Sequence, residues 1–239
     1  MNKPLRITIL TLFPEFIEAY KKFGIVQRAL KKKLIFVEAL YLRKFGLDER
    51  QTVDDRPYGG GVGMVLRPDV MHKAIQSWKR GNKGAGSRVI LLTPQGKRFG
   101  QAEARRLVKY KNILLVSGRY EGFDERIRSF VDEEVSLGDF VLMGGELPAL
   151  AVTEAVIRLI PSVLGKFEST EAESFSVAKP GAATLLEYPQ YTKPEVLVVG
   201  KKKLRVPKVL RTGHHANINE WRAAEAHKRT KKRRPDLLK

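Results

Sequence analysis

The chain has 239 residues, 43% of them hydrophobic, which allows one sizeable core with a small second domain and excludes an intrinsically disordered chain. It carries 45 Lys and Arg against 26 Asp and Glu, and a formal charge of +19 makes nucleic acid the leading partner, although charge alone fits a ribosome-bound structural protein as well as an enzyme. The sequence has no cysteine, which excludes disulfide frameworks, thiolate zinc sites and cysteine nucleophiles.

An apolar run at residues 7–13 opens the chain. It is too short to cross a bilayer, no small-residue cleavage pattern follows it, and it continues directly into Pro14 and Glu15. We therefore expect a first strand here, no membrane partner, and a cytoplasmic protein.

Apolar, β-branched runs then alternate with helical patterns. Strands are expected at residues 6–13, 34–42, 88–93, 112–117 and 134–136, and helices from Pro14 onward and at residues 69–78, 101–109 and 148–160. Strands that alternate with helices predict an α/β fold with a mostly parallel sheet covered on both faces.

Three glycine-bearing loops follow these strands, at residues 54–63, 118–122 and 137–145. Ligands of open α/β sheets bind at the carboxyl edge of the strands, so the crevice between such loops is the expected site. The first loop is no nucleotide fingerprint, because no Gly-Lys-Ser/Thr follows it and Met64 takes the place of the last glycine of the dinucleotide motif. By itself it indicates a sharp turn or a close approach of backbone to a flat ligand.

The composition changes after residue 164. Residues 165–190 are rich in Ser, Thr, Glu, Ala, Gly and Pro, which is typical of a flexible linker or lid. Residues 191–239 are expected to form a basic, helical domain, with Trp221 on a helix at residues 217–228. The last 39 residues carry 14 basic and 3 acidic side chains, which predicts the strongest phosphate-binding surface there.

Six strings, in order and at compatible spacings, resemble the signatures of the bacterial tRNA (guanine-N1)-methyltransferase family. They are DDRPYGGGVGM from Asp54, TPQG from Thr93, GRYEGFDER from Gly118, GDFVLMGGELPA from Gly138, YPQYTKPEV from Tyr188 and GHHANINEWR from Gly213. The resemblance implies a trefoil-knotted methyltransferase domain of the SPOUT class at residues 1–164, the linker or lid at 165–190, and a small helical tRNA-binding domain at 191–239. It also implies a homodimer that uses S-adenosylmethionine to methylate N1 of the guanosine immediately 3′ of the anticodon, position 37 of tRNA.

The resemblance carries a set of site residues onto this sequence. Those expected around S-adenosylmethionine are Leu92, Thr93, Pro94, Gly96, Gly118, Tyr120, Glu121, Leu137, Gly138, Phe140, Leu142, Gly144 and Gly145. Those expected to contact RNA are Arg56, Gly59, Gly60, His214, Lys231, Lys232, Arg233 and Arg234. Small-residue loops expose backbone groups to a ligand, and Leu and Phe flank a flat base. Glu121 is placed near the methionine end of the cofactor, facing its cationic groups or bound magnesium, with an ion pair to Arg119 or Arg126 as the alternative.

Two further residues are expected to perform the chemistry. Guanine N1 carries a proton at neutral pH, so its methylation needs a general base, and the resemblance aligns Glu173 with the family's catalytic aspartate. Arg158 matches the arginine that stabilises the negative charge developing on O6. A solvated acidic residue and a surface arginine are the alternatives from the residues themselves. His214 and His215 are adjacent and have no third ligand nearby, which argues against zinc.

This sequence departs from the family pattern at four places. Glu173 replaces an aspartate, Val62 a proline and Gln190 a histidine, and residues 176–184 are longer than the usual segment. Two alternatives therefore stay open: a knotted methyltransferase that acts on another RNA, and an RNA-binding homologue with weakened catalysis.

Overall fold

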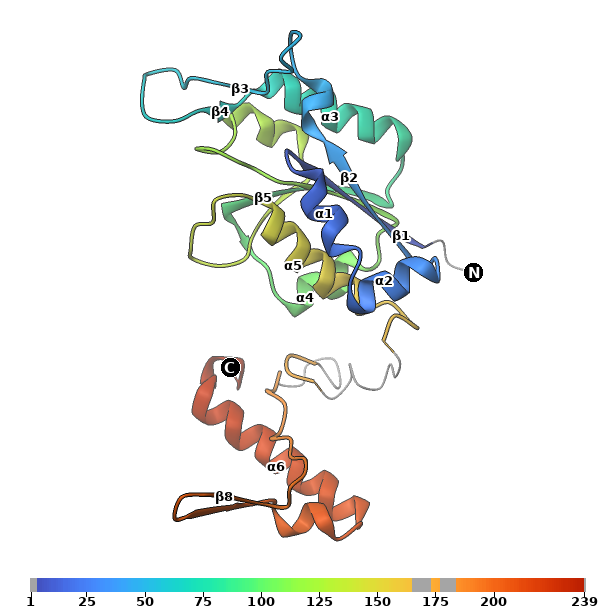
Figure 1. The fold of residues 1–239 in the computed structure, drawn as a ribbon, viewed down its shortest axis with the longest axis vertical. Helices are drawn as coiled ribbons and strands as arrows, with labels where there is room; N and C mark the ends of the chain where they lie inside the picture. The colour runs from blue at the N-terminus through green and yellow to red at the C-terminus, as the bar shows by residue number, and fades with distance from the viewer. Residues whose placement is uncertain (1–3, 165–172, 177–183, 239) are drawn as a thin grey trace. The chain divides into compact units, whose positions relative to one another are not determined.

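The computed structural model describes residues 4–164, 173–176 and 184–238. The chain divides into two compact units, Met1–Gly165 and Lys166–Lys239 (Figure 1). Among the described residues, no helix is both long and apolar enough to span a membrane.

The first unit is built on a five-stranded parallel sheet. Its strands are β1 (Leu5–Thr11), β2 (Ile35–Tyr41), β5 (Ser87–Arg98), β6 (Asn112–Val116) and β7 (Glu133–Ser136), in the order β2-β1-β6-β5-β7. The parallel sheet and the alternation of strands with helices confirm the predicted α/β class.

Helices cover both faces of this sheet (Figure 1). One face packs against α1 (Pro14–Tyr20), α2 (Gly24–Lys31), α4 (Gln101–Leu107) and α5 (Glu146–Ile157). The other packs against α3 (Pro68–Gly81) and the 3-10 segments η1 (Leu42–Phe45) and η2 (Glu125–Phe130). Successive side chains of a strand point to opposite faces. Ile7 and Ile9 of β1 accordingly enter one core and Leu10 enters the other.

The structure moves several predicted boundaries. β1 ends at Thr11 rather than at residue 13, α4 ends at Leu107, and α5 occupies Glu146–Ile157 instead of residues 148–160. β5 continues to Arg98, five residues beyond its predicted end. The glycine-rich loop is bracketed by a short antiparallel pair, β3 (Asp54–Asp55) and β4 (Val65–Leu66), so its first two residues were wrongly predicted as loop.

The second unit contains a hairpin and a long helix. The hairpin, β8 (Val196–Val199) with β9 (Lys202–Arg205), corrects the prediction of a helical segment over these residues. Three valines within residues 196–199, followed by a turn glycine, Gly200 at φ +59°, explain the difference. After η4 (Lys208–Arg211), α6 runs over His215–Arg233, longer than predicted at both ends, and η5 (Pro235–Leu238) follows it.

The described parts of the predicted linker are hydrogen-bonded into this unit. Leu186 N donates to Thr230 Oγ1 of α6 at 2.8 Å, and Phe175 N donates to Leu185 O at 2.9 Å. Thr230 is fully buried, and its hydroxyl in turn donates to Ala226 O. Residues 173–176 and 184–187 are thus attached to one another and to the end of α6.

Candidate active site

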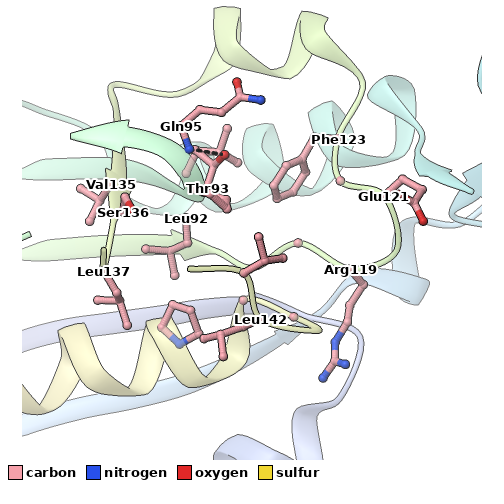
Figure 2. A pocket seen from close by; sticks show the side chains of 18 of the residues that line it. Leu92, Thr93, Gln95, Arg119, Glu121, Phe123, Val135, Ser136, Leu137 and Leu142 are labelled. Carbon is pink, nitrogen blue, oxygen red and sulfur yellow. Dashed lines mark hydrogen bonds between the residues drawn. The ribbon is translucent and has the colours of Figure 1, made fainter. Parts of the chain in front are cut away.

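A cavity of about 310 Å³ opens at the carboxyl edge of the parallel sheet, where the binding crevice was expected. It is lined by residues 91–95, 118–125, 135–138 and 140–145 together with Arg128 and Pro148. Figure 2 shows the leucines Leu92, Leu137 and Leu142 around it, with Phe123 and Glu121 from the loop after β6. Its volume is at the lower end of the range for pockets that enclose small ligands.

The β5 side of the cavity is made by a break in strand pairing. The register of β5 against β7 shifts between Leu92 and Lys97, which frees Thr93, Pro94 and Gln95 to line the cavity. Gln95 N donates to Thr93 Oγ1 at 3.3 Å and closes this turn (Figure 2). A bulge commonly redirects side chains next to a site.

Gly96 has a different position from that expected. It lies outside the cavity lining, and a Cβ atom there would come within 2.4 Å of Val135 N in β7. The absence of a side chain therefore serves the close approach of β5 to β7.

The loop after β6 contributes Gly118, Tyr120 and Glu121. A Cβ on Gly118 would meet the Phe123 ring at 2.6 Å, so glycine is needed for packing here. Tyr120 has a positive φ of 61°, an uncommon conformation for a bulky residue and one that can mark a constrained site. Glu121 is exposed, and its N–H donates to Met64 O at 3.1 Å. The glycine-rich loop thereby ends against the cavity wall.

The loop after β7 closes the opposite side. Gly138 has φ +154°, and its N–H donates to Ser136 Oγ at 3.1 Å. Phe140 and Leu142 line the cavity while staying partly exposed. Gly145 N donates to Gly118 O at 2.9 Å, and a Cβ on Gly145 would lie 2.6 Å from Ser117 Cα. The two loops therefore touch at positions where only glycine fits.

Sequence reasoning missed a buried ion pair beside this contact. Glu146, the first residue of α5, is only 2% exposed. Its carboxylate accepts from Arg119 Nε at 2.9 Å and from the buried Thr11 Oγ1 at 2.7 Å. A glutamate in the first turn of a largely apolar helix was the available signal. The alternative partners considered for Glu121 are thus engaged elsewhere: Arg119 pairs with Glu146, and Arg126 pairs with Asp124.

A second cavity of about 680 Å³ lies beside the glycine-rich loop and contains Arg56. The Arg126 guanidinium donates to both oxygens of Asp124, at 2.8 and 2.7 Å, and so lowers the pKa of that carboxyl. Gly59 and Gly60 have φ of +83° and +79° and lie next to the fully exposed Tyr58. The predicted RNA-contacting residues of this loop are therefore accessible.

The remaining predicted RNA contacts belong to α6 and its ends. His214 precedes the helix and is exposed, as are Lys231, Lys232, Arg233 and Arg234 at its other end. Arg234 donates to Asp236 at 2.9 and 2.7 Å, which raises the pKa of its guanidinium. Among the described residues, no group of three or more His, Asp or Glu side chains forms a candidate metal site.

The two residues predicted to perform the chemistry are not among those that line the cavity. Arg158 follows the last residue of α5, 10 residues after Pro148, which lines the cavity, and this separation is roughly 15 Å along a helix axis. Glu173 belongs to the second unit, where its carbonyl accepts from Ser176 N at 3.1 Å and Ser176 Oγ at 2.7 Å. Neither residue lines the cavity.

The cavity suits a ligand with a flat ring and a polar tail. Leucine and phenylalanine side chains provide apolar walls, while residues around Gly118, Gly138 and Gly144 bring backbone close to the space. A nucleoside conjugate such as S-adenosylmethionine has both parts, so the residues present fit it.

Comparisons with known proteins find relatives that match nearly the whole chain. A family model described as tRNA (Guanine-1)-methyltransferase TrmD matches residues 5–239. Relatives named tRNA (guanine-N(1)-)-methyltransferase include those of Sorangium cellulosum, 46% identical over 98% of this chain and 93% of the relative, and Bacillus subtilis, 45% identical with the same coverages. The relative from Trichodesmium erythraeum is 46% identical over 98% of both chains. Across nearly its whole length, the chain belongs to the tRNA (guanine-N1)-methyltransferase family.

Proposed function

We propose that the protein transfers a methyl group from S-adenosylmethionine to N1 of the guanosine immediately 3′ of the tRNA anticodon. The observation that carries this proposal is the cavity at the sheet edge, because its walls are the loops that resemble the family's cofactor loops. Family membership supports the reaction class, and the basic second unit supports a tRNA substrate. We infer that the enzyme works in the cytoplasm, where bacterial tRNA matures.

The reaction needs a proton acceptor and a stabiliser of negative charge. S-adenosylmethionine supplies an electrophilic methyl group, and guanine N1 becomes nucleophilic as its proton leaves. We assign the acceptor to the Glu173 carboxylate, which takes the proton from N1. We assign charge stabilisation at O6 to the Arg158 guanidinium. Glutamate is one methylene longer than the family's aspartate, so the backbone at residue 173 must lie slightly farther from the guanine.

We propose that a homodimer brings these groups together. The distance of Arg158 from the cavity along α5 supports a site that takes groups from two chains. Large apolar side chains are also exposed near the cavity, among them Val141 and Met143 at 83% and 91%. Exposed apolar patches mark interaction surfaces.

Sedimentation of the chain at micromolar concentration should therefore give the mass of a dimer. Val141→Asp with Met143→Asp should shift the equilibrium toward monomer, because charge is buried unpaired in the interface. A wild-type monomer at this concentration would contradict the two-chain site.

We further propose that the first unit is knotted. The segment after β6 passes on the α3 face, where Phe123 and Ile127 pack. After β7 the chain returns to the end of β6 at Gly145 and continues into α5 on the opposite face. Both contacts are explained if the segment after β7 passes beneath the segment after β6 before it enters α5, and this passage forms the knot. A crystal structure traced through residues 118–146 tests this path.

Methyl transfer to unmodified tRNA transcripts tests the function. Label from S-adenosylmethionine should enter transcripts with a guanosine 3′ of the anticodon and map to N1, and it should be absent when adenosine replaces that guanosine. Label at another position or in another RNA would favour a different knotted methyltransferase. Cofactor binding without transfer would favour the RNA-binding homologue. Repeating the assay with a chelator decides whether magnesium is needed.

The affinity for tRNA should fall steeply with salt, because Lys and Arg that contact phosphate release counterions. Replacing Lys231, Lys232, Arg233 and Arg234 by Gln should flatten the log–log slope by up to about 4, roughly 0.9 for each lost contact. Replacing Lys31, Lys32 and Lys33, a basic run in the first unit, is the control and should leave the slope near that of the wild type. An unchanged slope in the fourfold variant would move the phosphate contacts elsewhere.

A further inference from the structure

Three segments of the first unit meet at one buried carboxylate. Glu146 begins α5, Thr11 ends β1, and Arg119 stands in the loop after β6. Glu146 Oε1 accepts from Thr11 Oγ1 at 2.7 Å, and Oε2 accepts from Arg119 Nε at 2.9 Å. Glu146 is 2% exposed and Thr11 is fully buried.

Arg119 extends this network to the cavity wall. Its guanidinium carbon lies 4.4 Å from the centre of the Phe13 ring, and Nη1 donates to Met143 O at 3.4 Å. Arg119 and Met143 both line the cavity, from the loops at 118–122 and 137–145. The side chain that neutralises Glu146 is therefore also a link between the two loops.

Gly144 lies directly against the ion pair between Arg119 and Glu146. A Cβ at this position would lie 2.3 Å from Arg119 Nε and 2.7 Å from Glu146 Oε2, so the ion pair occupies the space that a side chain would take. Separating a buried ion pair is costly because it leaves an uncompensated charge. Gly144 of the loop at 137–145 therefore lies directly against the Arg119 side chain of the loop after β6.

We propose that Glu146 is a positioning residue for the cofactor pocket, acting through Arg119 to hold the loops at 118–122 and 137–145 in register. The inference rests on the proposed function, since it concerns the pocket assigned to S-adenosylmethionine. Glu146 itself does not line the cavity, so its effect reaches the ligand through the loops. The expected signature is weaker cofactor binding with little change in turnover at saturation.

The chain offers matched controls away from the cavity. Glu133 accepts from Arg88 at 3.1 Å and from Arg106 at 2.6 Å, a similar charge pair that joins β7, β5 and α4 outside the lining. Thr153, within α5, is fully buried like Thr11, and its hydroxyl has no hydrogen-bond partner among the described residues. Glu133→Gln and Thr153→Val are thus the same substitutions as Glu146→Gln and Thr11→Val, made at positions outside the cavity lining.

Equilibrium binding of S-adenosylmethionine and steady-state kinetics on the full chain test the proposal. Glu146→Gln should raise Kd and KM for S-adenosylmethionine by about tenfold or more, a change of roughly 1.4 kcal/mol, while kcat at saturation changes less than about threefold. Thr11→Val removes two hydrogen bonds, the one that Thr11 Oγ1 donates to Glu146 and the one that it accepts from Phe13 N, and should raise Kd by roughly three- to tenfold. Affinity for tRNA should be retained in both. The two control variants should keep wild-type Kd.

The measured Kd values support or overturn the positioning role of Glu146. A Glu146→Gln chain with wild-type Kd, or equal loss in Glu146→Gln and Glu133→Gln, overturns the inference. If Glu146→Gln fails to fold, the comparison of Thr11→Val with Thr153→Val replaces it, and equal Kd for these two overturns the inference. Failure of the wild-type chain to bind S-adenosylmethionine would overturn the proposed function and this inference together. Normal wild-type binding with unaffected variants overturns the inference alone.

Discussion

Glu173→Gln should lower single-turnover methylation of tRNA by about 10²- to 10⁴-fold, the range expected when a general base is lost. The amide keeps the size and hydrogen bonding of the side chain but cannot accept the proton of guanine N1. The backbone at this position is fixed by two hydrogen bonds from Ser176, so the substitution should not displace it. Affinities for cofactor and tRNA should stay near wild type.

A carboxylate in the same part of the chain provides the control. Glu187 is assigned no role in the reaction: its N–H donates to Ser174 Oγ at 3.0 Å, and its carboxylate accepts from Gln190 Nε2 at 2.6 Å. Glu187→Gln removes an equivalent charge and should leave the rate of methyl transfer within a few-fold of wild type. If Glu173→Gln methylated tRNA at the wild-type rate, Glu173 would not be the base. Glu171, which lies outside the described residues, would be tested next.

Glu173→Asp is the informative companion, because it restores the residue usual in the family. A shorter side chain on the same anchored backbone places the carboxylate about an ångström farther from N1, and such a displacement can lower the rate by about 10²-fold. We expect partial activity, between the rates of the wild type and Glu173→Gln. Full activity would show that the backbone at residue 173 adjusts to the side chain.

Gly144→Val should weaken binding of S-adenosylmethionine by at least about tenfold, or 1.4 kcal/mol, while tRNA affinity stays nearly intact. A Cβ at this position meets Arg119 Nε at 2.3 Å and Glu146 Oε2 at 2.7 Å. These atoms belong to flexible side chains, but they are held in an ion pair with a buried carboxylate. The substitution must therefore separate the pair or displace the loop at 137–145, and either change alters the cavity wall.

Gly81→Val is the matched control, since a Cβ at the end of α3 meets nothing within 4 Å. It should keep wild-type affinity for both ligands. Isothermal titration with cofactor and filter binding with tRNA measure the two constants. Equal loss of both affinities in Gly144→Val, accompanied by a lower melting temperature, would mean that the fold and not the pocket had failed.

Periodicity and composition were sufficient for the fold class and for the basic second unit. Apolar strands of five to seven residues can be buried on both sides only within a covered parallel sheet, so the α/β class followed from local pattern. The error at residues 196–205 has a local origin. The stretch was predicted as part of the basic, helical segment that follows it, whereas Val196–Val199 and Gly200 favour a hairpin.

The site residues were available from the sequence only through the resemblance of whole strings. Spacing alone could not distinguish Gly96, which serves the approach of β5 to β7, from Gly145, which touches the loop after β6, because both depend on which backbone lies opposite. For the same reason, a linker composition gave no sign that Leu186 is hydrogen-bonded to Thr230.

The sequence by itself determined the alternation of strands and helices, the charge, and the order of the family strings, because each depends on residues that are neighbours in the chain. Tertiary structure alone decided that Thr11, Arg119 and Glu146 form one buried network. These residues are up to 135 positions apart, and their hydrogen bonds exist only once β1, the loop after β6 and α5 have packed together. A buried carboxylate is stable only with such partners, and no local pattern can specify which distant side chains provide them.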